Sequence, residues 1–125
     1  MSNTRLPATC AAILARHLRP EPFKALCDPT RLMLVARLAI TPRALTVTEA
    51  SDCCGVHVSG TSRHLSLLKS AGIVEAERNG REVTYRLKHD ALIETLRGFA
   101  DALEHCRNEV ETGTQSHRDR EGVRE

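Results

Sequence analysis

The sequence is poor in aromatic residues and has no long apolar stretch. Only Phe23, Tyr85 and Phe99 are aromatic among its 125 residues, and tryptophan is absent. The core must therefore be built from aliphatic side chains, which favours packed helices over an aromatic-rich β-sandwich. No apolar run approaches the roughly 18 residues that span a bilayer, and the N-terminus lacks the cationic-then-apolar layout of a signal peptide. We expect a cytoplasmic protein that does not contact a membrane.

The cysteines do not form the pattern of a secreted disulfide scaffold. There are five of them, at positions 10, 27, 53, 54 and 106, which is an odd number at irregular spacing. A reducing cytosol keeps such cysteines as thiols. Their function, if they have one, is then metal binding or redox chemistry.

The net charge of +2 hides a marked asymmetry along the chain. Residues 1–58 and 59–89 each carry three more basic than acidic groups, whereas residues 90–106 carry three more acidic than basic groups and residues 107–125 one more. The first 89 residues are thus suited to a polyanionic partner. A chain of this length is one domain, and its thin aliphatic core would gain from dimerisation.

The first half of the sequence predicts helices. Residues 9–18 form an amphipathic pattern that Pro20 and Pro22 end, and a short helical turn follows. Asp28-Pro29 predicts the start of a longer helix, because Asp caps free backbone N–H groups and Pro suits the first helical position. This helix should reach about residue 39, with an inward face made of Leu32, Val35, Leu38 and Ala39.

Two helices and a hairpin follow. Thr46 and Glu49 have the spacing of a capping box that opens a short helix, and Gly55 suits its left-handed end. Ser59 is the expected cap of the next helix, which turns Leu65 and Leu68 inward. Asn79-Gly80 then predicts a β-hairpin whose turn has positive φ at both central residues.

The final helix should begin at Asp90 and end near Cys106. Its apolar residues recur at spacings of four and three, the seam pattern of two helices packed side by side. The seam consists of Leu92, Leu96, Phe99 and Leu103. We assign residues 1–8 to a flexible N-terminus, 9–106 to one folded domain and 107–125 to a disordered tail, which has few apolar residues.

Two short helices followed by a basic hairpin have the layout of a winged helix-turn-helix. The small residues that open the second helix would let its N-terminus approach the major groove, and basic side chains on the helix and the hairpin would reach phosphates. For His64 two roles stay open, a packed hydrogen-bonded residue or a phosphate contact. Ser62 and His64 lack the acidic partner and oxyanion motif of a hydrolase, so we do not expect an enzyme. The predicted DNA-binding residues are Ser59, Gly60, Thr61, Ser62, Arg63, His64, Ser66, Lys69, Arg78 and Arg81.

Three stretches between about residues 20 and 106 resemble the ArsR/SmtB family of winged-helix repressors. They are FKALCDPTRLMLVARL, TVTEASDCCGVHVSGTSRHLSLLKSAGIV and ERNGREVTYRL, of which the second is the most specific. The resemblance implies a mainly α fold with a small β-hairpin. It also implies a homodimer, paired through its first and last helices, that leaves a two-fold double-stranded operator when an inducer binds.

The sensing residues depart from the family pattern. The resemblance places the family's C-x-C box at Thr46 and Thr48, which are poor ligands for soft ions. Cys53 and Cys54 remain, and their thiolates suit thiophilic ions; Cys106 is the preferred third ligand and Cys10 the second choice. Packing roles for these cysteines stay open.

The sequence therefore predicts a repressor released by a thiophilic metal or metalloid, As(III) first. Two alternatives remain, a thiol-based redox-sensing regulator that binds no metal and a small dimeric interaction protein whose basic face is incidental.

Overall fold

The computed structural model describes residues 12, 19–52 and 55–121. These residues fall into two compact units, one of residues 19–94 and one that contains residues 95–121. The predicted flexible segment 1–8 lies outside the described residues, and so does the first helix, apart from Ala12.

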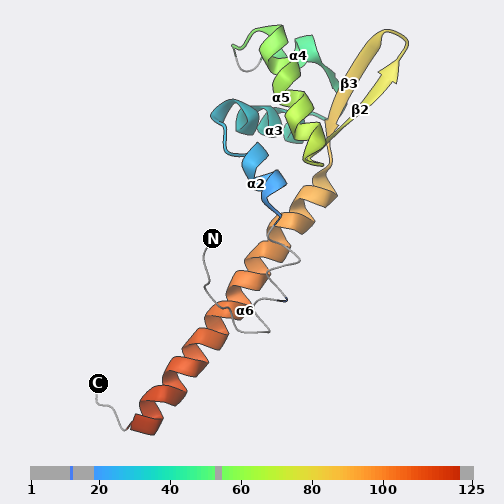
Figure 1. The fold of residues 1–125 in the computed structure, drawn as a ribbon. Helices are drawn as coiled ribbons and strands as arrows, with labels where there is room; N and C mark the ends of the chain where they lie inside the picture. The colour runs from blue at the N-terminus through green and yellow to red at the C-terminus, as the bar shows by residue number, and fades with distance from the viewer. Residues whose placement is uncertain (1–11, 13–18, 53–54, 122–125) are drawn as a thin grey trace. The chain divides into compact units, whose positions relative to one another are not determined.

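Helices dominate the structure, and a small antiparallel sheet completes it (Figure 1). The sheet has three strands in the order β1-β3-β2. This confirms the predicted mainly α fold with a β-hairpin, to which β1 adds a short third strand. The elements are α2 (Pro20–Ala25), α3 (Pro29–Ile40), β1 (Leu45–Thr46), α4 (Val47–Ser51), α5 (Val58–Ser70), β2 (Val74–Asn79), β3 (Glu82–Leu87) and α6 (His89–Glu121).

The start of α3 is capped as the sequence predicts. The carboxylate of Asp28 accepts hydrogen bonds from the backbone N–H groups of Thr30, at 2.8 Å, and Arg31, at 3.1 Å. The bond from Arg31 is the largest of the effects that lower the pKa of Asp28 below its usual value. A lowered carboxyl pKa means that the cap stabilises the fold above about pH 4 and that this contribution is lost as the pH falls through the folded-state pKa.

The inward face of α3 differs in part from the prediction. Leu34 and Leu38 are the buried residues of this helix, Val35 is half-buried, and Leu32 and Ala39 are exposed. Two residues along a helix correspond to about 200° of rotation. Leu32 therefore lies on the side opposite Leu34, and its predicted inward position was wrong.

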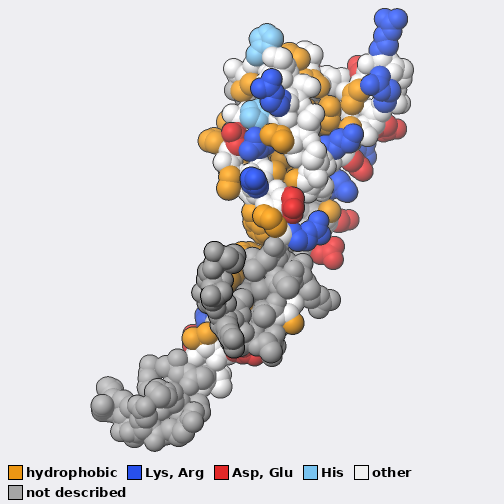
Figure 2. Space-filling model, viewed as in Figure 1, with side chains coloured by type: hydrophobic (Ala, Val, Ile, Leu, Met, Phe, Trp, Pro, Cys, Tyr) orange, Lys and Arg blue, Asp and Glu red, His pale blue; other side chains and the backbone are white. Residues whose placement is uncertain are grey.

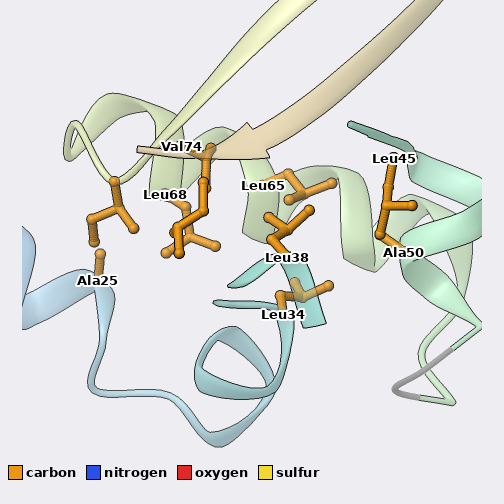
Figure 3. Close-up of a cluster of buried hydrophobic side chains, with 10 residues drawn as sticks. Ala25, Leu34, Leu38, Leu45, Ala50, Leu65, Leu68 and Val74 are labelled. Carbon is orange, nitrogen blue, oxygen red and sulfur yellow. The ribbon is translucent and has the colours of Figure 1, made fainter. Parts of the chain in front are cut away.

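One aliphatic core joins α2, α3, α5 and the sheet within the unit of residues 19–94 (Figure 3). Leu34, Leu45, Leu65 and Leu68 are at most 1% exposed. Leu92, from the first turns of α6, packs against the same cluster while remaining partly exposed. The predicted inward positions of Leu65 and Leu68 are thus confirmed, whereas Leu92 contacts this core although it was assigned to the seam.

The hairpin turn is shifted by one residue from its predicted position. Asn79 pairs with Glu82, so the two central residues are Gly80 and Arg81. Gly80 has a φ of 66°, and no described residue other than glycine has a positive φ. A two-residue turn with glycine first and positive φ only there is the type II′ alternative to the expected turn. The shift puts Arg81 inside the turn itself.

The helix α6 runs beyond Cys106 to Glu121, where the sequence suggested a disordered tail. Two polar pairs stand on this helix at helical spacing, the exposed ion pair of Arg107 with Glu104 and the half-buried pair of His105 with Glu109, each at 3.5 Å. Such pairs support exposed helices without any apolar contact. Lack of apolar residues, on which the tail prediction depended, therefore does not exclude a helix. Within the described residues, no helix is both long and apolar enough to cross a membrane.

We expect Leu34→Ala to lower the free energy of unfolding by about 2–5 kcal/mol, because the cavity it leaves is lined by close-packed aliphatic side chains. Leu32→Ala is a matched control on the same helix, since Leu32 is 50% exposed. The control should cost clearly less. Urea denaturation followed by circular dichroism measures both, and equal losses would contradict the assigned inward face of α3.

Candidate nucleic-acid interface

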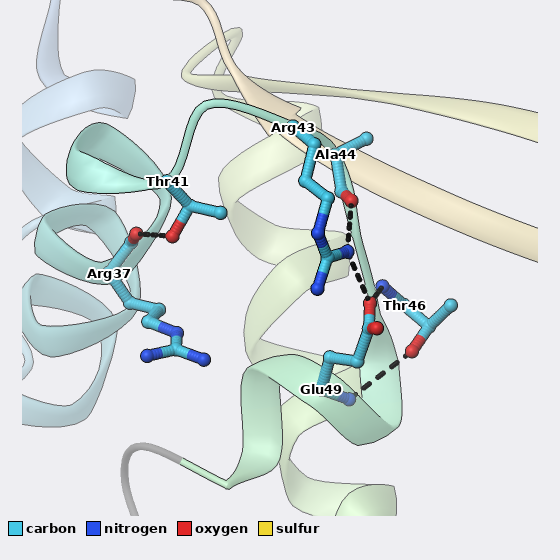
Figure 4. Close-up of polar contacts among 6 residues, drawn as sticks. All are labelled: Arg37, Thr41, Arg43, Ala44, Thr46 and Glu49. Carbon is cyan, nitrogen blue, oxygen red and sulfur yellow. Dashed lines mark hydrogen bonds and ion pairs between the residues drawn. The ribbon is translucent and has the colours of Figure 1, made fainter.

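The helix α4 is short and fixed at its start by the predicted capping box. Thr46 Oγ1 accepts from the backbone N–H of Glu49 at 3.2 Å, and the carboxylate of Glu49 accepts from the backbone N–H of Thr46 at 2.9 Å (Figure 4). The chain leaves the helix toward Gly55, whose φ of 64° is left-handed as predicted. Thr46 is thus committed to a backbone cap.

An ion pair ties the loop before β1 to this cap. Arg43 Nη1 lies 3.1 Å from Glu49 Oε1, and both side chains are substantially exposed (Figure 4). The hydrogen bond between them raises the pKa of Arg43 and lowers the pKa of Glu49. Exposed pairs contribute little to stability, so this pair joins the loop to the cap without adding much to the stability of the fold.

The start of α5 differs from the prediction. His57 is the N-cap, and its Nδ1 accepts from the backbone N–H of Ser59 at 3.2 Å. Ser59, the predicted cap, lies within the first turn, with its hydroxyl 3.0 Å from the same nitrogen. His57 is not the cap that the sequence predicts, because Ser is the commoner cap and stands two residues away.

The helix α5 has one buried and one exposed face. Leu65, Leu68 and Thr61 form the buried face, and Thr61 is 0% exposed. The prediction that Thr61 contacts DNA was therefore wrong. Leu65 and Leu68 follow Thr61 by four and seven residues, so all three lie on the same buried face of the helix. The other predicted residues of α5 are half-buried or exposed, namely Ser59, Gly60, Ser62, Arg63, His64, Ser66 and Lys69.

Gly60 has a packing reason for its small size. A Cβ atom at this position would lie 3.0 Å from Cγ1 of Val56, which is tighter than nine in ten real Cβ contacts. The prediction explained the glycine by close approach of a ligand to the helix N-terminus. Val56 would have to move by a few tenths of an ångström to admit a Cβ atom, so packing is a second reason for glycine at this position.

The hairpin of β2 and β3 carries basic side chains at its tip. Arg78 and Arg81 are both exposed, and Arg78 Nη1 donates to the backbone oxygen of Gly80 at 3.5 Å. Figure 2 shows Lys and Arg side chains on this hairpin and over the helical part of the same unit. The structure thus gathers a basic helix face and a hairpin with a basic tip in one compact unit.

His64 is bonded to α3. Its Nδ1 lies 3.2 Å from Nη1 of Arg31, and the ring is half-buried. Of the two roles left open for His64, this contact establishes the hydrogen-bonded one for Nδ1. It leaves open what Nε2 does.

The candidate metal ligands are only partly described. Cys53, Cys54 and Cys10 lie outside the described residues, Cys106 is half-buried on α6, and Cys27 is exposed before α3. In the part of the chain that the structure describes, no group of three or more His, Cys, Asp or Glu side chains has the geometry to hold a metal ion.

The predicted seam is partly exposed along α6. Leu96 is 44% exposed and Leu103 50%, Phe99 is half-buried, and Val110, seven residues after Leu103, is 60% exposed. A seven-residue spacing keeps side chains on one stripe of a helix that packs against a second helix. The stripe thus extends past the predicted end of the seam.

A short capped helix, a turn, a second helix with a polar outer face and a two-stranded wing with a basic tip define a winged helix-turn-helix domain. Comparison with known proteins agrees. Residues 26–77 match a family model described as a helix-turn-helix domain.

A curated relative is the HTH-type transcriptional repressor SmtB of Mycobacterium tuberculosis, 39% identical over 86 residues, 69% of this chain. The matched part spans 60% of that relative's length.

Two solved structures are similar over most of the chain. One is a homodimeric winged helix-turn-helix DNA-binding domain from Mycobacterium bovis, described as a possible ArsR-family regulator, with 27% identity, a TM-score of 0.54 and coverage of 90% of this chain and 95% of that one. The other is a possible transcriptional regulator for arsenical resistance, with 28% identity, a TM-score of 0.58 and coverage of 74% and 95%. The chain belongs to the ArsR/SmtB family of winged-helix transcriptional regulators, a family of regulators and not of enzymes.

Proposed function

We propose that this protein is a homodimeric transcriptional repressor that binds duplex operator DNA and leaves it when a thiophilic ion binds. The observation that carries the DNA-binding part is the polar face of α5, which is exposed together with the basic wing. The contacting residues that we propose are those of the sequence prediction without Thr61. Ser59, Gly60, Ser62 and His64 would lie nearest the groove, whereas Arg63, Ser66, Lys69, Arg78 and Arg81 would contact the backbone or the neighbouring groove.

Phosphate contacts supply a salt-dependent share of the affinity. Each neutralised phosphate contributes about −0.9 to the slope of log affinity against log salt. Arg63 and Arg81 stand on different elements, α5 and the wing. Removing both therefore tests the whole proposed surface.

We expect the double variant Arg63→Ala, Arg81→Ala to bind duplex DNA more weakly, with a salt slope that is shallower by about 0.9 for each phosphate that these side chains neutralise in the wild type. Fluorescence anisotropy with the DNA upstream of the chain's own gene, at several salt concentrations, measures both quantities. Arg97→Ala, Arg107→Ala is a control pair that removes the same charge from α6. If the two pairs bind alike, the basic face is incidental and an interaction protein is the better interpretation.

Dimerisation is proposed from the exposed stripe on α6. Leu96, Leu103 and Val110 present apolar surface, and their seven-residue spacing is that of a heptad. A helix seam of this kind buries its apolar residues against a second copy. The homodimeric state of the similar Mycobacterium bovis domain supports the same assembly.

We expect Leu96→Asp, Leu103→Asp to convert a dimer to a monomer while the fold of residues 19–94 is kept. Sedimentation velocity gives the mass, and circular dichroism checks the helix content. Ile40→Asp is the control, since Ile40 is 79% exposed on α3, outside the stripe. A dimer that survives the double substitution would show that α6 does not form the interface.

The inducer proposal comes from the chemistry of the cysteines. Thiolates are soft ligands that prefer thiophilic ions, and the sequence offers Cys53 and Cys54 next to the turn that precedes α5. Cys106 is the third donor in this proposal, with Cys10 as the alternative. One similar structure is a possible regulator for arsenical resistance, which favours As(III) as the first ion to test.

Release of DNA then follows from linkage. If the ion binds the off-DNA conformation more tightly, DNA weakens ion binding by the same factor. About 3 kcal/mol of coupling would lower operator affinity roughly 150-fold.

We expect Cys53→Ser to keep DNA binding and to abolish release by As(III), and Cys106→Ser to weaken As(III) binding. Titration of the reduced protein–DNA complex with As(III), Hg(II), Cd(II) and Zn(II), read by anisotropy, measures release. Cys27→Ser is the control, because Cys27 is exposed and is not among the proposed ligands. Release by peroxide alone, reversed by a thiol reductant, would instead identify a redox regulator without metal.

A further inference from the structure

A single side chain of α3 connects three parts of the unit of residues 19–94. Arg31 Nη1 lies 3.2 Å from His64 Nδ1 on α5, and Arg31 Nε donates to the backbone oxygen of Ala25 at 2.5 Å. The backbone N–H of the same residue donates to the Asp28 cap at 3.1 Å. The guanidinium is therefore held at Nε by Ala25, and the backbone that carries it is held by the Asp28 cap.

The chemistry of this contact fixes the proton on the ring. A guanidinium has only donors, so it can meet Nδ1 only where that nitrogen is an acceptor. A neutral imidazole with an acceptor at one nitrogen carries its hydrogen on the other. In its neutral form, His64 facing Arg31 is thus the tautomer with the hydrogen on Nε2.

The position of the ring leaves the hydrogen on Nε2 available as a donor. His64 lies on α5 at the edge of its buried face, four residues before Leu68, and its ring is half-buried, so part of it reaches the surface. In the described part of the chain, the hydrogen bond of its ring is the one made by Nδ1. Nε2–H is then a donor with a fixed direction on the helix that carries the proposed DNA-binding face.

We propose that Arg31 is a positioning residue, which holds His64 so that its Nε2–H donates to a phosphate oxygen of duplex DNA. This inference rests on the proposed DNA-binding function. Phosphate oxygens accept most protein–DNA hydrogen bonds, and a donor whose tautomer and orientation are set in advance loses less entropy on binding. Arg31 itself need not touch DNA, because it acts through the histidine.

The tautomer is measured on the wild-type protein alone. A long-range proton–nitrogen NMR spectrum at about pH 8, above the usual histidine pKa, distinguishes hydrogen on Nε2 from hydrogen on Nδ1. We expect His64 to carry it on Nε2. An Nδ1–H tautomer would overturn the inference, whatever the DNA-binding result.

The contribution to binding is measured with two amide variants. The side-chain nitrogen of Gln reaches the position of histidine Nε2, whereas that of Asn stops near Nδ1. We expect His64→Gln to bind duplex DNA within about threefold of wild type and His64→Asn roughly tenfold more weakly, the size of one hydrogen bond to a charged acceptor. Equal binding by both variants would overturn the inference.

Arg31→Met removes the donor and keeps most of the side-chain length. We expect roughly tenfold weaker DNA binding and a His64 spectrum with mixed tautomers, whereas Arg97→Met, which removes the same charge from α6, changes neither. If Arg31→Met unfolds, the wild-type spectrum and the two His64 variants still decide. If wild-type protein binds no duplex, the proposed function fails, and the spectrum tests the Arg31 contact separately.

Discussion

The burial of one side of α5 is the constraint on which the other features depend. Leu65, Leu68 and Thr61 are pinned in the core with no exposed surface. Because a helix is rigid and turns about 100° per residue, fixing this face determines which residues point outward. Core packing and the composition of the candidate DNA surface are therefore two consequences of one amphipathic pattern.

Much of this could be predicted from local sequence signals, and the errors have physical causes. The cap at Asp28, the capping box at Thr46 and the left-handed Gly55 each depend on a few adjacent residues, and each was confirmed. The N-cap of α5 and the hairpin turn were each predicted at the wrong residue. In both cases two nearby residues compete for the same role, His57 and Ser59 for the cap, and Asn79 and Gly80 for the first central position of the turn. The sequence does not decide between them, because both solutions satisfy the same backbone groups.

Long-range contacts were the harder part of the site. The Arg31–His64 contact joins residues 33 positions apart, and no local pattern predicts it. The burial of Thr61 was readable in principle, since it shares the helical spacing of Leu65, but small polar residues near a helix start also suggest groove contacts. The cysteine site depends on Cys53 and Cys54, outside the described residues, and stays a prediction.

Thr46 belongs to two structures at once. As the last residue of β1 it pairs with Thr84 on β3, and as the N-cap of α4 it accepts from the backbone N–H of Glu49. The strand and the helix meet with no linker between them, so a change in the tilt of α4 would act directly on the strand that pairs with the wing. Through this shared residue, the position of the first helix of the helix-turn-helix is coupled to the position of the hairpin.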